Sequence, residues 1–419
     1  MSPANSPLPE ASGEERAASP RWLSIVGVGE DGVEGLSPVA RGLVGAAEIV
    51  FGGRRHLGLA APLIRGATRP WPSPFDSAPE EVTRHRGRQV CVLASGDPFQ
   101  YGVGAVLARH VDPREMIVVP APSAFSLAAA RLGWSLPQTV LLSLHGRSLD
   151  LIRPHLQPGA RILALTSDGE APAALAKLLA QTGFGTSRLT ILEWLGGPRE
   201  RIRDTTAGDF AFDDVGPLNT LAIEVVATPD ARVLARTPGL ADALFEHDGQ
   251  ITKREVRAVT LSSLGPRRRE LLWDIGAGSG SVAIEWMLTD PTMRAVAVER
   301  RADRAARIRR NAAAFGVSSL EIVEAAAPDA LAGLATPDAI FIGGGGDSAV
   351  LDAASRGLRS GGRLVVNAVT LETEALLLAR HAALGGELIR IAISRAEPVG
   401  EKTGWRAAMP VTQWLWVKP

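Results

Sequence analysis

Short apolar runs alternate with alanine-rich, helix-forming stretches from Trp22 onward. WLSIVGVG (22–29) and RQVCVLASGDP (88–98) have the character of buried strands that end in glycine turns. Strand, turn and helix follow one another again at 115–133 and at 160–183. Strands separated by helices predict a mostly parallel sheet covered on its faces, with a ligand crevice beyond the carboxyl ends of the strands.

Helix signals support this division of the first half. The stretch 37–53 is predicted as a helix with Ser37 as its N-cap and a proline in the first position. Ser123 is the expected N-cap of a later helix. The stretches 187–210 and 218–227 indicate two strands with no helix of useful length between them, so an antiparallel ending is expected.

A second α/β series begins after the stretch 228–250, which has no sustained period and contains two prolines. We place the domain boundary near residue 240. A helix is predicted over 252–264, with Thr252 as its N-cap and Glu255 as the capping-box partner. Strands with crossover helices are expected at 271–275, 295–299, 320–324, 338–342 and 362–367. Together with two final strands after residue 387 they predict a doubly wound, seven-stranded sheet with one antiparallel edge.

The composition is that of a packed globular protein rather than of a general polyanion binder. Hydrophobic residues make up 46% of the 419 residues, and the formal net charge is +0. No apolar run approaches the length that spans a membrane. The lone Cys91 allows neither an internal disulfide nor a multi-cysteine zinc site, so no metal is expected and the chain is compatible with a reducing cytoplasm. Residues 1–20, rich in Pro, Ser, Ala and Glu, are predicted to be disordered.

The strongest chemical signal is LLWDIGAGSGSVAIEW (271–286), which combines a buried strand, a glycine turn and the start of a helix. Its glycines follow the pattern G-x-G-x-G, whereas the dinucleotide fingerprint needs a glycine where this chain has Ser281. Glu299 ends the next strand, 19 residues after Gly280, where an acidic residue can accept both ribose hydroxyls of an adenosine. Asp274 places a carboxylate where an ammonium or a sulfonium is favoured and a pyrophosphate is not. The turn is therefore predicted to hold S-adenosylmethionine rather than NAD.

Nucleic acid is disfavoured as the methyl acceptor. Adenine-N6 enzymes carry an Asn/Asp-Pro-Pro-aromatic segment after the fourth strand, where this chain has FIGGGGDS (341–348). Cytosine-C5 enzymes need a cysteine nucleophile, and the one cysteine lies in the other domain. Four successive glycines suggest a backbone that passes close under a large flat ligand, with a flexible loop as the alternative. The expected substrate contacts are Gly343, Gly344 and Gly345.

Four segments of the second half resemble, in order and spacing, the C-terminal domain of the precorrin-6B C5,15-methyltransferases (decarboxylating) of cobalamin biosynthesis. These segments are HDGQITKREVRAVTLSSLGP, WDIGAGSGSVAIEW, FIGGGG and VVNAVTLET. The resemblance implies a class I methyltransferase that methylates C-15 and removes carbon dioxide from the ring-C acetate. Ala326 stands where many relatives have an Asp that contacts the adenine amine, so backbone atoms near Ala327 are expected to replace that contact. The implied cofactor site comprises Thr252, Asp274, Gly276, Ala277, Gly278, Ser279, Gly280, Glu299, Ala326 and Ala327.

The first half resembles the class III tetrapyrrole methylases. The matching segments are GVGEDGVEGLSPVA, LASGDPFQYGVGAVL and VVPAPSAFSLAAARLGW, followed by SLHGR and LTSDGEAP. That family folds S-adenosylmethionine into a cleft between two subdomains, and the implied contacts are Gly96, Asp97, Ser123, Ala124, Leu144 and His145. Gly27 and Gly29 would face the tetrapyrrole. Asp97 alternatively caps its own turn, and His145 is alternatively a packed histidine at a strand end.

Methyl transfer from a sulfonium to an electron-rich ring carbon needs alignment and exclusion of water rather than an activated nucleophile. A polycarboxylate substrate should be bound by arginines in both clefts. His247, Asp248 and Lys253 lie just before and at the first helix of the second domain. They are candidates for substrate carboxylate contact or proton transfer, against the alternative of an ordinary helix N-terminus with exposed charges.

The resemblances imply a bifunctional S-adenosylmethionine-dependent methyltransferase of the cytoplasm that converts precorrin-6B to precorrin-8. Residues 21–240 would form a two-subdomain tetrapyrrole methylase that acts at C-5. Residues 241–419 would form a doubly wound, Rossmann-like class I methyltransferase that acts at C-15 and decarboxylates. A homo-oligomer, a dimer or a tetramer, is expected. Two alternatives stay open: a non-catalytic tetrapyrrole carrier with degenerate donor sites, and an NAD-linked dehydrogenase fused to an unrelated domain.

Overall fold

The structure is a computed structural model that describes residues 21–72, 75–343 and 346–419. Its contacts divide the chain into two compact units. The first unit runs to His145 and resumes at Ala160–Val225, and the second comprises Gly146–Gly159 and Val226–Pro419. The expectations for residues 1–20, Gly344 and Gly345 lie outside the described residues. Among the described helices, none is both long and apolar enough to cross a bilayer.

The first sheet of the first unit is parallel, in the order β3-β2-β4-β1-β5. β1 is flanked by β4 and β5 and all its residues are buried, which accounts for its continuous apolar sequence. Ser37 caps the first helix as predicted, with its Oγ 3.2 Å from the amide nitrogen of Ala40. The strands are β1 (Leu23–Val28), β2 (Ile49–Gly52), β3 (Ala67–Pro70), β4 (Val90–Ser95) and β5 (Met116–Val119). The helices are α1 (Pro38–Ala46), α2 (Arg54–Ala60), α3 (Ala78–Thr83) and α4 (Val103–Leu107).

The prediction of a single helix over 37–53 is wrong. α1 ends at Ala46, and β2 follows it and pairs with β3 and β4. The β-branched and aromatic side chains of β2 are buried in the sheet, and this burial outweighs the helical character of the residues before them.

The second sheet of the first unit is mixed, in the order β6-β7-β10-β8-β9. β6 and β7 are parallel, and the remaining pairs are antiparallel. The antiparallel ending is thus confirmed, with three strands rather than the predicted two. Ser123 caps α5 as predicted, since its Oγ accepts a hydrogen bond from the amide of Ser126 at 3.1 Å. The elements are α5 (Ala124–Leu132), β6 (Thr139–Ser143), β7 (Arg161–Leu165), α6 (Ala171–Gln181), β8 (Arg188–Glu193), β9 (Arg201–Thr206) and β10 (Asn219–Glu224).

The second unit contains a seven-stranded sheet in the order β13-β12-β11-β14-β15-β19-β16, so the doubly wound fold is confirmed. The antiparallel strand is β19, which lies between β15 and β16 rather than at the edge itself. Helices α7 to α9 pack on one face and α10 and α11 on the other, through two separate clusters of buried side chains. The strands are β11 (Leu271–Ile275), β12 (Arg294–Val298), β13 (Glu321–Val323), β14 (Ala339–Ile342), β15 (Arg363–Ala368), β16 (Glu387–Ile391) and β19 (Val411–Val417). The helices are α7 (Arg254–Leu264), α8 (Ser281–Leu288), α9 (Ala302–Ala314), α10 (Ser348–Gly357) and α11 (Leu371–Leu384).

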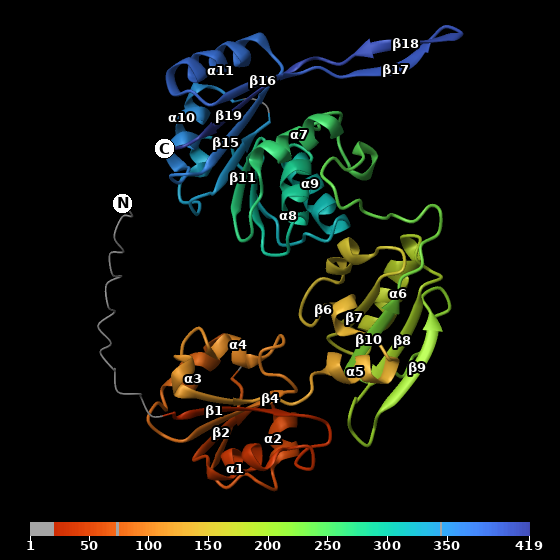
Figure 1. The fold of residues 1–419 in the computed structure, drawn as a ribbon, viewed down its shortest axis with the longest axis vertical. Coiled ribbons are helices and arrows are strands. Elements are labelled where there is room, and N and C mark those ends of the chain that lie inside the picture. Colours follow the sequence, from red (N-terminus) through yellow and green to blue (C-terminus); the bar gives the residue numbers. More distant parts are fainter. Residues whose placement is uncertain (1–20, 73–74, 344–345) are drawn as a thin grey trace, which may run out of the picture. The chain divides into compact units, whose positions relative to one another are not determined.

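Two expectations for the second unit are wrong in detail. The C-terminal stretch holds four strands rather than two, because β17 (Ser394–Val399) and β18 (Lys402–Ala407) form a hairpin that extends from the sheet (Figure 1). Thr252 is not the N-cap of α7: Lys253 occupies that position without a side-chain cap hydrogen bond. Glu255 forms an ion pair with Arg395 of β17 instead of closing a capping box.

Two segments outside 241–419 belong to the second unit, namely 146–159 and 226–240. Leu234 and Leu240 are buried in the same cluster as α7 and α8. The side chain of Gln157 donates to the carbonyl oxygen of Leu234 at 2.9 Å. The compact units therefore divide 15 residues before residue 240, at Val225. Short 3₁₀ turns complete the fold: η1 (Phe75–Ser77), η2 (Pro113–Glu115), η3 (Leu136–Gln138), η4 (Leu149–His155), η5 (Asp242–Leu244) and η6 (Asp329–Leu331).

Candidate functional site

The glycine turn after β11 requires glycine for conformational reasons. Gly276, Gly278 and Gly280 have φ angles of 73°, 60° and 74°, in the left-handed region that side chains disfavour. A Cβ on Gly280 would also lie 2.8 Å from Cγ2 of Ile308 on α9. The turn thus brings bare backbone close to α9 and leaves its outer side open to a ligand.

Glu299, directly after β12, is bound to this turn. Its side chain is buried, with 4% of the residue exposed. Oε2 accepts a hydrogen bond from the amide of Gly278 at 2.9 Å, and Oε1 accepts one from the amide of Arg301 at 3.0 Å. Each carboxylate oxygen has a further lone pair, so Glu299 can still accept two hydroxyl groups. This arrangement fits the ribose of an adenosine.

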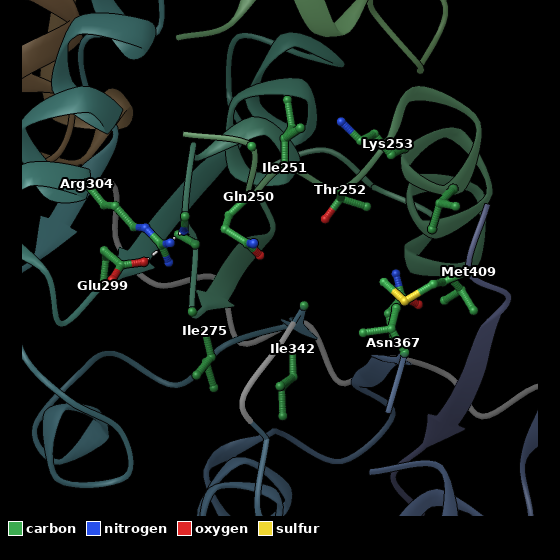
Figure 2. A pocket seen from close by; sticks show the side chains of 18 of the residues that line it. Gln250, Ile251, Thr252, Lys253, Ile275, Glu299, Arg304, Ile342, Asn367 and Met409 are labelled. Carbon is green, nitrogen blue, oxygen red and sulfur yellow. Dashed lines mark hydrogen bonds between the residues drawn. The ribbon is translucent and has the colours of Figure 1, made fainter. Parts of the chain in front are cut away.

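A cavity of about 690 Å³ opens beside the turn. Figure 2 shows Glu299 and Arg304 on one side of it and Asn367 and Met409 on the opposite side. We call these the turn side (Gly276–Gly278, Glu299, Ala325–Ala327) and the Asn367 side (Asn367, Val369, Ile391, Ile393, Met409). The cavity brings together nine of the predicted residues: Thr252, Lys253, Gly276, Ala277, Gly278, Glu299, Ala326, Ala327 and Gly343.

Three other predicted residues of the turn lie behind the cavity wall. Asp274 is 1% exposed, and its Oδ2 accepts a hydrogen bond from the amide of Ala283 at 3.1 Å. Burial raises the pKa of Asp274 to about 7, and the negative charge of Glu299 adds to the shift. Ser279 and Gly280 are also buried against the core. These residues therefore support the turn from within, whereas the cavity-lining residues face a ligand.

The three candidates for proton transfer are not gathered at one point. Lys253 lines the cavity, and its Nζ lies 3.9 Å from a carboxylate oxygen of Asp242. His247 accepts a hydrogen bond from the amide of Gly249 at 3.1 Å. Asp248 Oδ2 lies 2.9 Å from Nε of Arg304, whose guanidinium holds the pKa of Asp248 well below its usual range. His247 and Asp248 thus shape the loop that leads to the cavity.

Several cavity residues were not predicted from the sequence. Asn367 is a buried amide at the carboxyl end of β15, and Arg304 and Arg395 add positive charge. Ile391, Ile393 and Met409 give the Asn367 side an apolar surface. The one available signal was Asn367, a polar residue within the apolar run RLVVNAV. Arg304 lies on α9, and the others come from β16, from the hairpin β17–β18 and from its connections to the sheet, whose positions depend on tertiary pairing.

In the first unit Gly27 lies within β1, and the other predicted residues follow the ends of β1, β4 and β5 or, for Leu144 and His145, the end of β6. The amide of Ala121 donates to the carbonyl oxygen of Gly96 at 3.2 Å. Gly96 has a φ of 55°, and a Cβ there would lie 3.0 Å from Cα of Ser123, next to Ala124. A Cβ on Gly27 would collide with the carbonyl of Gly96. These glycines allow the three strand ends to meet.

Asp97 and His145 each have a structural partner. Oδ1 of Asp97 accepts a hydrogen bond from the amide of Phe99 at 2.8 Å, so the side chain caps its own turn. His145 is exposed, with Nδ1 3.2 Å from the carbonyl oxygen of Thr166, and it follows the fully buried Leu144. Gly29 is partly buried, and a Cβ there would lie 2.5 Å from Oδ1 of the nearby Asp31. Contacts of these residues with a ligand stay predictions.

Comparison with known proteins matches both halves. The sequence model of the tetrapyrrole (corrin/porphyrin) methylases matches residues 23–211, and that of the precorrin methyltransferase domain matches residues 243–418. A cobalt-precorrin-6B C(15)-methyltransferase (decarboxylating) of Salmonella typhimurium is 34% identical over 179 residues, 41% of this chain and 92% of the relative.

Longer relatives match nearly the whole chain. A precorrin-6Y C(5,15)-methyltransferase (decarboxylating) of Mycobacterium tuberculosis is 42% identical over 94% of this chain and 98% of the relative. The protein of the same name from a Sinorhizobium species is 58% identical over 98% of this chain and 100% of the relative. This agreement along both chains shows that the protein belongs to the precorrin-6Y C(5,15)-methyltransferase (decarboxylating) family.

Proposed function

We propose that the chain uses S-adenosylmethionine to methylate a precorrin at C-5 and C-15 and to decarboxylate its ring-C acetate, converting precorrin-6B to precorrin-8 in cobalamin biosynthesis. The observation that carries this proposal is the contact of Glu299 with the turn at Gly278, beside a cavity of about 690 Å³. The full-length relatives are named for both positions, and the relative matching 41% of this chain is named for C-15 alone. This difference supports one donor site per domain.

We assign C-5 methylation to the first domain and C-15 methylation with decarboxylation to the second. S-adenosylmethionine supplies a methyl group whose leaving group is a neutral thioether. Glu299 would hold the ribose hydroxyls, and the glycines at 276–280 would let the adenosine approach the backbone. Ile275, Ile342 and Val411 line the cavity and would exclude water from the reacting carbon.

Positive charge at the cavity suits a polycarboxylate. Lys253, Arg304 and Arg395 line it, and Glu255 and Asp248 hold the two arginines in place. Guanidinium groups bind carboxylates through paired hydrogen bonds, so the arginines would fix the rim of the macrocycle while its reacting carbon faces the turn side. Because methyl transfer depends on alignment of the ring carbon with the methyl donor, it needs no activated nucleophile.

The test is calorimetric titration of the full chain with S-adenosylmethionine, followed by mass spectrometry of the product from precorrin-6B. Two sites are expected, and Glu299→Gln should weaken binding at the second-domain site. Gly96→Ala should remove the other, because its Cβ would meet the carbonyl oxygen of Pro122 at 2.8 Å. The product should carry two additional methyl groups and one carboxylate fewer. Binding of the tetrapyrrole without turnover would instead favour the carrier, and protection by NAD in preference to S-adenosylmethionine would favour the dehydrogenase.

We also propose that the enzyme acts in the cytoplasm as a homo-oligomer. The buried thiol of Cys91 forms no disulfide, which suits a reducing compartment. The hairpin β17–β18 presents Trp405, which is 79% exposed, and an isolated two-stranded hairpin is only marginally stable in water. Packing against identical subunits would cover it. Light scattering should give the mass of a dimer or a tetramer, and a monomer contradicts this proposal.

A further inference from the structure

Asn367 is a buried amide that faces the cavity. It lies near the carboxyl end of β15, directly opposite Gln413 of β19 in the sheet register. Only 5% of the residue is exposed, although it lines the cavity wall opposite Glu299 (Figure 2). Buried amides of this kind have hydrogen-bond partners for nearly all of their polar atoms.

A network of side chains fixes the orientation of this amide. The hydroxyl of Thr260 donates to the carbonyl oxygen of Val256 at 2.8 Å, so its oxygen acts as an acceptor toward Asn367. Nδ2 of Asn367 donates to that oxygen at 2.9 Å. Nε2 of Gln413 donates to Oδ1 of Asn367 at 2.8 Å and to Thr260 at 3.1 Å, and its Oε1 accepts from Ser263 at 2.7 Å. These contacts therefore establish which atom of the Asn367 side-chain amide is the nitrogen and which is the oxygen.

The network leaves hydrogen-bonding capacity at Asn367. Thr260 donates once and accepts twice, and both N–H groups of Gln413 are used. Asn367 uses one N–H and one lone pair, and within the described part of the chain its second N–H has no protein acceptor. Because the side chain lines the cavity, this N–H is available to a ligand on the Asn367 side.

The charge of this donor matters for decarboxylation. A carboxylate paired with Lys253, Arg304 or Arg395 is stabilised as an anion, which opposes loss of its electron pair. Asn367 is neutral and its neighbours on the Asn367 side are apolar, so it can orient a carboxylate without stabilising its charge to the same degree. Gln250 and Thr252 are also neutral, but the carbonyl oxygen of Gln250 lies 3.5 Å from the Cβ position of Gly278, on the turn side.

We propose that Asn367 orients the substrate carboxylate that leaves as carbon dioxide, and this inference rests on the proposed function. When the ring carbon has gained its methyl group, the macrocycle carries a positive charge. The C–C bond to the carboxylate then breaks and its electron pair enters the macrocycle, which cancels that charge and releases carbon dioxide. A proton moves from the methylated carbon to the exocyclic carbon, so no oxidant or reductant is needed.

The test measures how far methylation and decarboxylation stay coupled in the full-length chain. Asn367→Ala removes the donor, and Asn367→Asp keeps the side-chain volume but presents no N–H, which covers the case in which the alanine variant does not fold. Ser263→Ala is the matched control, because it perturbs the same network at Gln413 and leaves the amide of Asn367 in place. Products from precorrin-6B are separated by mass, and binding of S-adenosylmethionine is measured by calorimetry.

The ratio of decarboxylated to merely methylated product should fall about tenfold in both Asn367 variants, the effect of losing one hydrogen bond to a charged group. Binding of S-adenosylmethionine should not change, and Ser263→Ala should keep the wild-type ratio. A wild-type ratio in Asn367→Ala or Asn367→Asp overturns the inference, as does a loss of S-adenosylmethionine binding that places Asn367 at the donor. A wild-type chain that does not convert precorrin-6B overturns the proposed function and the inference with it.

Discussion

The carboxylate of Glu299 accepts a hydrogen bond from the backbone amide of Gly278, with 2.9 Å between Oε2 and the nitrogen. This bond joins the end of β12 to the glycine turn after β11, two parallel strands that lie side by side. The residue expected to bind the ribose therefore also holds the backbone that approaches it. Its substitution should affect the shape of the turn and the ligand contact together.

Glu299→Gln should weaken binding of S-adenosylmethionine at the second-domain site about 10- to 100-fold, the range for hydrogen bonds to a charged group. The reason is that a glutamine amide has one acceptor oxygen, whereas Glu299 accepts from the amides of both Gly278 and Arg301. Calorimetric titration provides the affinity. Glu321→Gln, at the exposed start of β13, is the control and should bind as the wild type does. Equal affinity of Glu299→Gln and wild type contradicts the placement of the ribose.

Gly280→Ala should destabilise the second domain by about 3 kcal/mol, because the left-handed backbone is strained and the new Cβ meets Ile308 at 2.8 Å. Gly333→Ala is the matched control. Gly333 has a φ of 83°, with no described atom within 4 Å of its Cβ position, so it should cost only about 1 kcal/mol. Denaturant unfolding of both variants separates the conformational cost from the steric one. Equal losses of stability in the two variants would mean that α9 moves aside without an energetic cost.

The fold of the second unit could be predicted closely because its central strands are continuous apolar runs between clear turns. β11 matches the predicted 271–275 at both ends. Glu299 was identifiable because its distance from the glycines follows from one helix and one strand between them. Spacing of this local kind can be predicted from the sequence alone.

Other parts depend on tertiary contacts and could not be read in this way. The hairpin β17–β18 is largely exposed and polar, so it lacks the apolar alternation that identifies a half-buried strand. Asn367 and Gln413 are 46 residues apart, and they meet only through the antiparallel pairing of β15 with β19. The 146–159 segment lies within the first domain as predicted from the sequence but belongs to the second compact unit. No hydrophobic periodicity in the sequence indicates this.

Asp274 should make the stability of the second domain depend on pH. Burial raises its pKa to about 7 in the folded protein, whereas the unfolded chain loses the proton near its ordinary value of about 4. Between these values the folded state binds more protons than the unfolded state, so the free energy of unfolding falls as the pH rises. Asp274→Asn removes this contribution, which amounts to about 4 kcal/mol at most.

The measurement is the free energy of unfolding of wild type and Asp274→Asn across this pH window. The difference between them should grow in favour of the variant from about pH 4 to about pH 7 and then stay constant. Asp329→Asn, at an exposed position, should follow the wild-type pH dependence. Parallel curves for wild type and Asp274→Asn would show that Asp274 is ionised in the folded protein at the same pH as in the unfolded chain.

Asp248 should act by holding the loop over the glycine turn rather than by transferring a proton. Its Oδ2 contacts Arg304 at 2.9 Å and Arg307 at 3.3 Å, and its Oδ1 accepts from the amide of Gln250 at 3.1 Å. The arginines hold the pKa of Asp248 well below its usual range, so it stays ionised at neutral pH and cannot supply a proton there.

Asp248→Asn should weaken S-adenosylmethionine binding at the second-domain site about 3- to 10-fold by loosening this loop. The pH dependence of turnover should keep its wild-type shape. Retained affinity for S-adenosylmethionine with a displaced pH profile of turnover would instead identify Asp248 as the group that transfers the proton. The comparison that separates the two roles is Lys253→Met, which leaves the loop contacts of Asp248 intact.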